Sequence, residues 1–589
     1  MCTGQLLRTT VRSLALLAAG GLYGCSGLIG DAPKGPIASL PPGKVPSPTG
    51  QPSPSPSTSP TPSPTPTPSM DPAPELNAAA SRLRRLDPDQ LAASARDLLS
   101  LRDEDVVALR IPLDEGTVPS LLTVDRLDAA ATTVTALGAH RSFAPCPIEG
   151  NGSPECAAAF ITAFGGRAFR RPLSTEETAW LSGIYQGARA EFTFSESIDV
   201  LARVILESPQ FLYVVEEGVA EAGLPTGLLR LTPWELASRL SYFLWDTMPD
   251  DALLSAAAED KLKTSAEILV QVDRMLADPR ARAKFIRFTS KLMELNGTAR
   301  HVSIEEAVKD PTRFPLDSPA LRQAMRQEIE SFVGKVWDSG GSIEALFTSK
   351  EAYVNGPLAE LYGVSGGPTR ADDWAWVTLP ANQRAGIATR AAFLFVYATP
   401  EIPSPIRLGA AVWRDFLCYT FPPPPPEAMD VHIIPGEQGG RIFSIRQAVE
   451  AKTSGRNCVG CHSKMNPAGF TFGHYDALGQ WQDEERGVTP MGANYTAPID
   501  STGELVGSDV PGALPDALAL SAKLATSRNV KDCFATRTWG AAFGRLPQVG
   551  EESSVRYVQG KLAATGSLKD AIRAVVDSPG FRYLRKGTP

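Results

Sequence analysis

The chain has 589 residues, of which 43% are hydrophobic and 21% are charged, and its net charge is −8. This is the composition of a globular protein, and it excludes a wholly disordered chain and a protein with many membrane spans. The acidic balance and the lack of a Lys/Arg-rich block exclude nucleic-acid binding as the main function. At roughly 150 residues per domain, the length predicts about four domains.

The first residues have the features of an export sequence. Arg8 and Arg12 precede the apolar run Ser13–Leu22, which is too short to span a bilayer and is typical of a signal-peptide core. The sequence LYGC, which ends at Cys25, resembles a bacterial lipobox. The resemblance implies removal of residues 1–24 and lipidation of Cys25, which would anchor an exported protein to the outer membrane or the cell surface. The alternative is an ordinary secretory signal with an incidental cysteine.

A proline-rich segment follows the predicted anchor. Residues 41–74 hold 14 of the 51 prolines, alternating with Ser and Thr. Because proline fixes φ and has no backbone N–H, such a segment forms neither helix nor sheet. At about 3.1 Å per residue, it would extend roughly 100 Å as a polyproline-II-like spacer. We therefore expect residues 25–78 to be a disordered tether that holds the folded part away from a membrane.

The order of helix-start patterns predicts a mainly α fold with minor β elements. An N-cap residue followed three positions later by Glu or Gln is typical of a helix start, and this pattern begins at Asp87, Ser174, Thr232, Thr264 and Ser303. Ser318-Pro319 predicts a further start. Within one helix, Leu236, Leu240, Phe243 and Leu244 share one face. Strands are expected only near 370–380 and 495–505.

Two distant segments resemble each other. Residues 156–177 and 204–218 contain a Cys, a Phe-Gly-rich turn and the ending Ser-Pro-x-Phe-x-Tyr, and residues 533–547 and 574–587 repeat this order. The pattern predicts two related helical units whose aromatic endings anchor the core. Helices of merely similar composition are the alternative.

Four cysteines lie outside any motif, and in an exported protein they are expected to pair. They are Cys146, Cys156, Cys418 and Cys533. Cys146 and Cys156 are close in sequence, and the loop between them holds Pro, Gly and Asn, so we pair them. The disulfide Cys418–Cys533 then follows by elimination. The alternative is that some of the four stay reduced and buried.

The chemistry-bearing motif is Cys458-Val459-Gly460-Cys461-His462. This spacing is that of covalent c-type haem, in which two thiols bind the porphyrin edge and the following His is the proximal iron ligand. We therefore predict haem c on Cys458, Cys461 and His462. A thioredoxin-type site needs a βαβ setting, which is not predicted. A zinc site would need two further ligands, for which His474 and His432 are candidates although the spacing is not that of a zinc finger. A structural disulfide is the remaining alternative.

The distal ligand is less well defined. Met491 is the best methionine candidate, whereas Met465 is too close to His462 to reach the opposite haem face. His474 and His432 are alternatives. A distal Met favours electron transfer, and an open site would permit peroxide or small-ligand chemistry.

Three further features have simple structural interpretations. The segment Ile499–Gly503 lacks the alternating acids of a calcium loop, so we expect a turn. His140 and His301 are expected to be surface or helix-capping residues.

Several strings resemble families found in exported proteins of planctomycetes and myxobacteria. Cys458–Gly487 resembles the planctomycete cytochrome c-like module, with Asn466 where Asp is usual and Gln482 where Arg is common. Leu231–Ala257 and Cys156–Glu177 are similar to planctomycete surface domains, and Arg82–Leu101 and the stretch from Leu505 are similar to further ones. These families are largely of unknown function, so the resemblance implies export and haem but no substrate.

Seven segments summarise the expected organisation. They are a lipoprotein signal peptide (1–24), a tether (25–78), a helical surface domain (79–145), a helical module with a Cys pair (146–220), a second helical surface domain (228–365), a cytochrome c-like haem module (380–490) and a C-terminal helical module (495–589).

The sequence thus favours a lipid-anchored, single-haem c-type cytochrome-like protein that performs electron transfer or haem-based redox chemistry. Its expected partners are a membrane and either a redox protein or a small oxidant; if it is an enzyme, it is a haem-dependent oxidoreductase. A second hypothesis is a cell-surface protein whose helical modules bind a polymer or a partner, with the haem module accessory. A third is a structural envelope protein in which the two motif cysteines form a disulfide.

Overall fold

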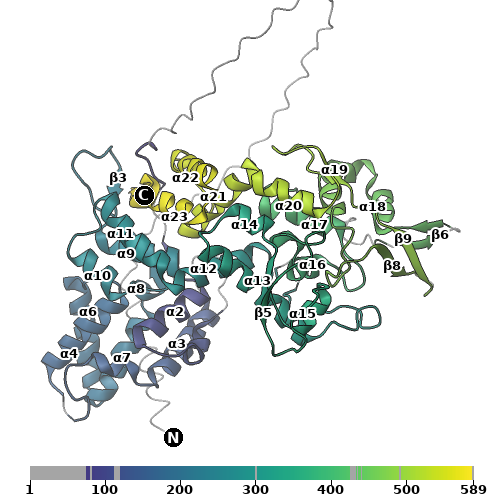
Figure 1. Ribbon diagram of the computed structural model, residues 1–589. Helices are drawn as coiled ribbons and strands as arrows, with labels where there is room; N and C mark the ends of the chain where they lie inside the picture. Colours follow the sequence, from purple (N-terminus) through teal and green to yellow (C-terminus); the bar gives the residue numbers. More distant parts are fainter. Residues whose placement is uncertain are drawn as a thin grey trace, which may run out of the picture. The chain divides into compact units, whose positions relative to one another are not determined.

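The computed structural model describes residues 74–79, 83–111, 120–150, 152–298, 302–424, 433, 435–438, 441–489 and 492–586 (Figure 1). The predicted signal peptide, Cys25 and residues 25–73 of the predicted tether lie outside these residues. The last tether residues, 74–78, are described, and Ala78 is buried, so the tether ends earlier than predicted. The predicted mainly α class with minor β elements is confirmed in the described part of the chain. None of its helices is both long and apolar enough to cross a bilayer.

The N-terminal elements end with a short strand. They are β1 (Arg84–Arg85), α2 (Pro88–Leu99), η1 (Asp103–Leu109), α3 (Leu121–Thr135), η2 (Ala139–Phe143), α4 (Pro154–Phe160), η3 (Ile161–Gly165), α5 (Gly166–Ala168), α6 (Thr175–Arg189), α7 (Phe194–Glu207), α8 (Pro209–Leu212) and β2 (Tyr213–Val214). Of the η elements, η1 and η2 are 3-10 helices and η3 is a π-helical turn.

The next group again begins with a strand that leads into a helix. Its elements are β3 (Leu228–Arg230), α9 (Pro233–Trp245), α10 (Asp251–Ala258), α11 (Ser265–Ala277), α12 (Pro279–Leu292), α13 (Pro319–Asp338), α14 (Ile343–Thr348), β4 (Glu351–Val354), α15 (Gly356–Leu361), β5 (Ala375–Thr378), the 3-10 helix η4 (Ile387–Thr389) and α16 (Ala391–Tyr397).

The remaining elements include the helix with the CxxCH motif, α19. They are α17 (Pro405–Ala411), the π-helical turn η5 (Val412–Phe416), β6 (Gly436–Gln438), β7 (Arg441–Phe443), α18 (Ile445–Thr453), α19 (Arg456–Phe470), β8 (Glu484–Val488), β9 (Asn494–Pro498), β10 (Gly503–Glu504), β11 (Ala513–Leu514), α20 (Ala517–Thr526), α21 (Arg528–Phe543), α22 (Glu552–Thr565), α23 (Leu568–Asp577), α24 (Pro579–Arg582) and β12 (Tyr583–Arg585).

Local capping explains where many helices begin. The boxes at Asp87, Ser174, Thr232 and Thr264 start α2, α6, α9 and α11, as predicted. The box at Ser303 forms its hydrogen bond from the Glu306 N–H, but only a turn follows, so the predicted helix is wrong there. Asp310-Pro311 lies a few residues on, and the residue before a proline disfavours helical dihedrals.

The described strands pair as two-stranded antiparallel ladders, and two of these ladders are related. In the β1–β2 ladder Arg85 faces Tyr213, and in the β3–β12 ladder Arg230 faces Tyr583. In each ladder the later strand, β2 or β12, directly follows a one-turn helix that opens with Ser-Pro. The Phe of each of these helices, Phe211 in α8 and Phe581 in α24, is buried. The sequence echo therefore corresponds to two structural units, each closed by pairing its last strand with its first.

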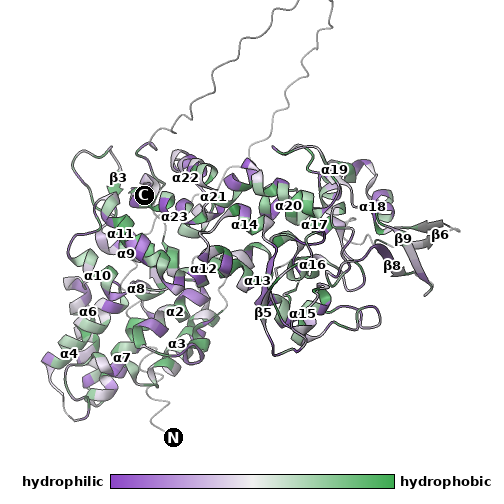
Figure 2. Ribbon diagram, in the orientation of Figure 1, coloured by the Kyte–Doolittle hydropathy of each residue, from purple (hydrophilic) through white to green (hydrophobic). Residues whose placement is uncertain are grey.

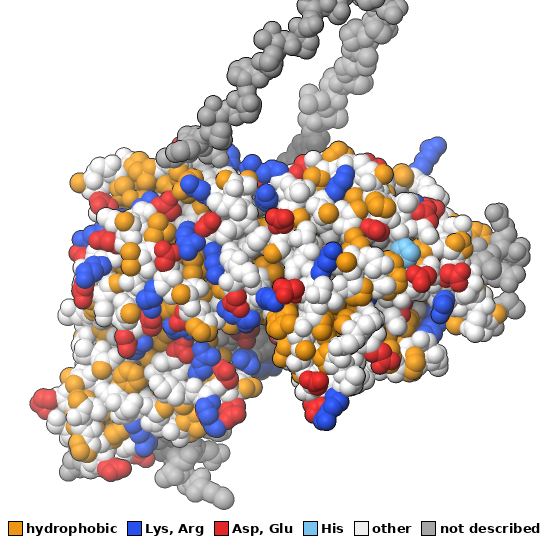
Figure 3. Space-filling view, in the orientation of Figure 1, with side chains coloured by type: hydrophobic (Ala, Val, Ile, Leu, Met, Phe, Trp, Pro, Cys, Tyr) orange, Lys and Arg blue, Asp and Glu red, His pale blue; other side chains and the backbone are white. Residues whose placement is uncertain are grey.

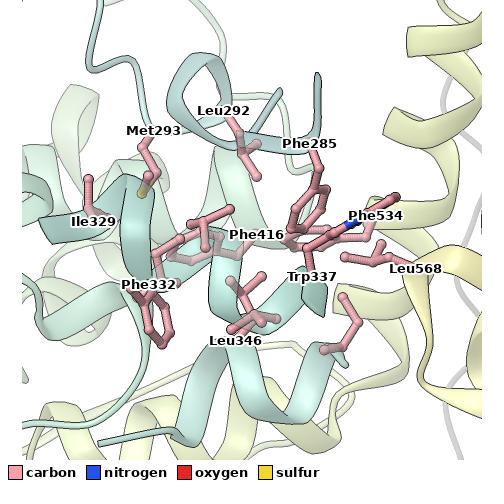
Figure 4. Packing of buried hydrophobic residues seen from close by; sticks show 14 of the residues in the cluster. Phe285, Leu292, Met293, Ile329, Phe332, Trp337, Leu346, Phe416, Phe534 and Leu568 are labelled. Atoms are coloured by element: carbon pink, nitrogen blue, oxygen red, sulfur yellow. The ribbon is translucent and has the colours of Figure 1, made fainter. Parts of the chain in front are cut away.

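A continuous apolar core joins α12 and α13 to the C-terminal helices α21 and α23. Phe285 from α12 and Trp337 from α13 lie with ring centroids 5.1 Å apart, and Phe534 from α21 and Leu568 from α23 approach them (Figure 4). Most helices in Figure 2 carry both hydrophobic and hydrophilic colours, as amphipathic helices do. On the face drawn in Figure 3, basic and acidic side chains are interspersed.

Two side-chain environments differ from the expected ones. The face of α9 predicted to be buried is buried, but every residue from Leu236 to Trp245 is buried, so this helix is enclosed on all sides. His140 is not a surface residue, because its ring is completely buried beside Phe160 and Phe164 and its Nε2 lies 2.8 Å from the Asp199 carboxylate. His301 lies outside the described residues.

Two disulfides join the cysteine pairs that the sequence suggested. Cys146 bonds Cys156 across a short loop that leads into α4, and Cys418 bonds Cys533 across 115 residues. The second disulfide ties the chain just after η5 to α21. It therefore links the region before the CxxCH motif to the C-terminal helices.

Candidate functional site

The three motif residues lie on the first two turns of α19. Cys458, Cys461 and His462 occupy positions i, i+3 and i+4, which lie on one side of a helix. All three are half-buried, and both cysteines are free thiols. Two thiols and an imidazole are therefore presented together.

The helix is fixed by a close backbone contact with α17. A Cβ atom on Gly469 would overlap the carbonyl oxygen of Pro405, and one on Gly409 would overlap that of Met465. The indole Nε1 of Trp413 also donates to the Lys464 carbonyl at 3.0 Å. Glycine is thus needed at both crossing points, and α19 has little freedom to move along α17.

A small apolar core holds α19 against α18. It consists of Ile445, Val449 and Phe470, all buried. A cavity of about 30 Å³ lies beside it, lined in part by Leu408. This volume suits about two water molecules rather than a porphyrin, and it lies at the opposite end of α19 from Cys458.

The imidazole of His462 is held by a buried amide. Its Nδ1 lies 2.9 Å from Oδ1 of Asn466, and Nδ2 of Asn466 donates to Oγ1 of Thr453 at 2.8 Å. Asn466 and Thr453 are each only 7% exposed. Asn466 lies one turn after His462 and was visible in the sequence as a departure from the family pattern, whereas no local pattern pointed to Thr453.

The other proposed ligands do not join this group in the described structure. His474 stacks on Trp481 with ring centroids 4.4 Å apart, and its Nδ1 lies 2.9 Å from the Gln482 carbonyl oxygen. Met491 and His432 lie outside the described residues. Among the residues described, no group of three or more His, Cys, Asp or Glu side chains is arranged to hold a metal ion directly. This gives the zinc alternative no ligand set in that part of the chain.

The Asp-x-x-Gly string that follows the motif, Asp476–Gly479, shapes a loop. One oxygen of Asp476 accepts hydrogen bonds from the N–H groups of Leu478 (2.9 Å) and Gln480 (2.8 Å). Burial raises the pKa of Asp476 to about 6. The buried guanidinium of Arg384 donates to the Gly479 carbonyl. Asp476 is therefore a loop-stabilising residue.

The segment Ile499–Gly503 contains the predicted turn. Asp500 accepts from the Thr502 N–H at 3.0 Å and pairs with Arg446 at 3.2 Å. Because the carboxylate already has a cationic partner, the arrangement does not favour a calcium ion.

The donor set on α19 fits a covalent haem. Two free thiols at the required spacing precede an imidazole whose Nδ1 is engaged by a protein acceptor, which is how metal-binding histidines are usually oriented. The described site therefore has two free thiols at the required spacing and a hydrogen bond that orients the His462 imidazole.

Three family models match separate parts of the chain. They are PSD5, protein of unknown function (DUF1595), at residues 156–216; PSD4, protein of unknown function (DUF1592), at residues 231–364; and PSCyt3, protein of unknown function (DUF1588), at residues 384–485. The CxxCH motif lies in the PSCyt3 match. No curated protein and no solved structure matches the chain. These three segments thus match planctomycete cytochrome c-like and surface-domain families, whose function is unknown.

Proposed function

We propose that this protein is an exported, lipid-anchored, single-haem c-type cytochrome-like protein that transfers electrons or performs haem-based redox chemistry at the cell surface. The observation that carries the proposal is the placement of Cys458, Cys461 and His462 on one side of α19, with both thiols free. A disulfide between the motif cysteines, as in the structural-protein hypothesis, would leave no thiol for attachment.

The site holds the residues that would attach the group. The thiols of Cys458 and Cys461 would hold haem through two thioether bonds, each made by adding S–H across a vinyl group, which consumes no oxidant. His462 would bind the iron. When bound, haem c supplies one-electron redox chemistry at its iron.

Export and anchoring rest on separate observations. Disulfides form and persist outside the cytoplasm, and the described chain has two, Cys146–Cys156 and Cys418–Cys533. The basic residues and the apolar run before Cys25 have the features of an export signal. The membrane anchor and the redox partner, either a protein or a small oxidant, are parts of this proposal.

The test is to express the full chain with a cytochrome c assembly system and examine it on a haem-stained denaturing gel. We expect the wild-type protein to stain and to give a reduced-minus-oxidised haem spectrum, and the Cys458→Ser/Cys461→Ser variant to do neither. The matched control, Cys146→Ser/Cys156→Ser, also removes two cysteines and is expected to stain. An unstained wild-type protein would overturn the redox proposal and favour a binding function for the helical modules.

Anchoring is tested separately with Cys25→Ser. We expect the wild-type protein to fractionate with membranes and this variant to be released into the soluble fraction. Retention of the variant on membranes would overturn the lipid anchor without touching the haem proposal.

A further inference from the structure

We infer that Asn466 and Thr453 are positioning residues that fix His462 in a single tautomer, with the proton on Nδ1 and the lone pair on Nε2. The reason for fixing the tautomer rests on the proposed haem function. The hydrogen bonds that fix it lie within the protein and do not depend on haem. The inference assigns a role to Asn466, the residue that departs from the pattern this segment resembles, and to Thr453 in the neighbouring helix α18.

The donor and acceptor of each hydrogen bond between Thr453, Asn466 and His462 can be assigned by starting from Thr453. The hydroxyl of Thr453 has a single proton, and Oγ1 lies 2.7 Å from the Val449 carbonyl oxygen, which can only accept. Oγ1 of Thr453 must therefore accept the second hydrogen bond, at 2.8 Å, from Asn466. The atom of Asn466 that faces Thr453 is consequently the amide nitrogen and not the oxygen.

The same reasoning then fixes the imidazole. With its nitrogen directed at Thr453, Asn466 presents Oδ1 to His462 at 2.9 Å. An amide oxygen only accepts, so Nδ1 of His462 must carry the proton. In a neutral ring the other nitrogen, Nε2, is then the acceptor with an available lone pair, which is the form that binds a metal.

The relay is rigid because both of its inner members are enclosed. Asn466 and Thr453 are each 7% exposed, and Val449, which ends the relay, is completely buried. Val449 also belongs to the apolar core between α18 and α19. The orientation of His462 is thus tied to the packing of two helices and is set before any haem arrives.

The choice of a neutral amide has an electronic consequence. A carboxylate at position 466 would accept the same hydrogen bond, and because it is the stronger acceptor it would make the imidazole a more basic ligand. A more basic imidazole would favour ferric iron and lower the reduction potential of a bound haem. Asn466 is therefore expected to give a higher potential than Asp would at this position.

The first experiment needs no haem. The full chain carrying Cys458→Ser/Cys461→Ser is labelled with ¹⁵N-histidine and examined by NMR at about pH 8, which is above the ordinary pKa of a histidine side chain. The variant His462→Gln assigns the resonance. We expect His462 to be in the Nδ1–H form. Thr453→Val, which keeps the side-chain shape but removes the relay's acceptor, is expected to give a mixture of tautomers, as is Asn466→Leu. An Nε2–H form in the parent, or no change in either variant, would overturn the inference.

The second experiment uses the holoprotein and measures the reduction potential. Asn466→Asp is expected to lower the potential more than Asn457→Asp, which adds the same charge at an exposed position on the same helix. Equal shifts would show a simple charge effect and overturn the tuning role. Failure of the wild-type protein to stain for haem would overturn the proposed function. It would not affect the tautomer assignment, which the NMR experiment tests without haem.

Discussion

The guanidinium of Arg390 forms an ion pair with the carboxylate of Glu328, and both side chains are 0% exposed. Glu328 lies on α13, within the PSD4 match, and Arg390 directly precedes α16, within the PSCyt3 match. Arg390 also donates to the Glu351 carbonyl at 2.7 Å, and the hydroxyl of Tyr362 donates to Glu328 at 3.3 Å. The two matched segments are therefore joined by charges that have no access to solvent.

Removing one member of this pair is expected to be costly. Arg390→Met leaves the Glu328 carboxylate buried without its partner, and breaking a buried pair in this way costs about 3–5 kcal/mol. The double variant Arg390→Met/Glu328→Leu removes both charges and is expected to lose less than the single variant. Thermal unfolding followed by circular dichroism measures both.

The control for the ion pair is Arg370→Met, since Arg370 pairs with Asp372 at the surface with both side chains largely exposed. Exposed pairs contribute little to stability, so its unfolding midpoint is expected to match the wild type. A double variant that is less stable than Arg390→Met alone would contradict this account of the buried pair.

The contact between α17 and α19 predicts that two Gly→Ala substitutions in α19 change the stability of the protein in opposite directions. In Gly469→Ala the new methyl group would overlap the Pro405 carbonyl, whereas at Gly460 nothing lies within 4 Å of an added Cβ. Overpacking of this kind costs about 1–3 kcal/mol, and replacing an exposed helical glycine by alanine gains up to about 1 kcal/mol.

Unfolding midpoints of the two glycine variants decide the matter. Gly460→Ala lies inside the CxxCH motif but changes neither cysteine nor His462, so it is also expected to retain haem staining. If Gly469→Ala proved as stable as Gly460→Ala, the close approach of α17 and α19 would be wrong.

The sequence was informative where a structure is determined locally. The capping box at Thr232 and the spacing of Cys458 and His462 depend only on residues within a few positions, so α9 and the helical placement of the motif were predictable. The predictions that were wrong concerned residues whose environment depends on partners far away in the sequence. His140 looked like a surface residue because Asp199, its hydrogen-bond partner, is 59 residues away.

The same reason explains what was missed around the site. The spacing of His462 and Asn466 was readable as i and i+4, but the orientation of the amide depends on Thr453, which belongs to another helix. The pairing of Glu328 with Arg390, 62 residues apart, had no local pattern at all. Residues 25–73 of the tether and Met491 remain predictions, since they lie outside the described residues.

The two disulfides are expected to differ in their contribution to stability. Cross-linking removes more entropy from the unfolded chain when the closed loop is longer: about 3 kcal/mol for the Cys146–Cys156 separation of 10 and about 5 kcal/mol for the Cys418–Cys533 separation of 115. Replacing each pair by serine and measuring urea unfolding tests the order. A larger loss for Cys146→Ser/Cys156→Ser would contradict it.

Asp476 predicts a stability that falls as pH rises. Burial raises its folded-state pKa from the ordinary 3.8 to about 6, so the folded protein binds the proton more tightly than the unfolded chain. The contribution of this proton to the free energy of unfolding is fully present below pH 3.8 and is lost as pH rises through about 6. It amounts to about 3 kcal/mol, because the pKa differs by about two units. Asp476→Asn keeps an acceptor for the N–H groups of Leu478 and Gln480 but does not titrate.

The unfolding midpoint of Asp476→Asn relative to wild type is therefore expected to increase between pH 4 and pH 7 and to stay constant above that. Asp500→Asn provides a control of opposite sign. Hydrogen bonds from Thr502 hold the pKa of Asp500 below its ordinary value, so its contribution is present above that value and lost on acidification. Asp500→Asn is thus expected to be less stable than wild type at neutral pH, with a difference that shrinks as pH falls. If both variants shifted in the same direction, the opposite environments assigned to these two carboxylates would be wrong.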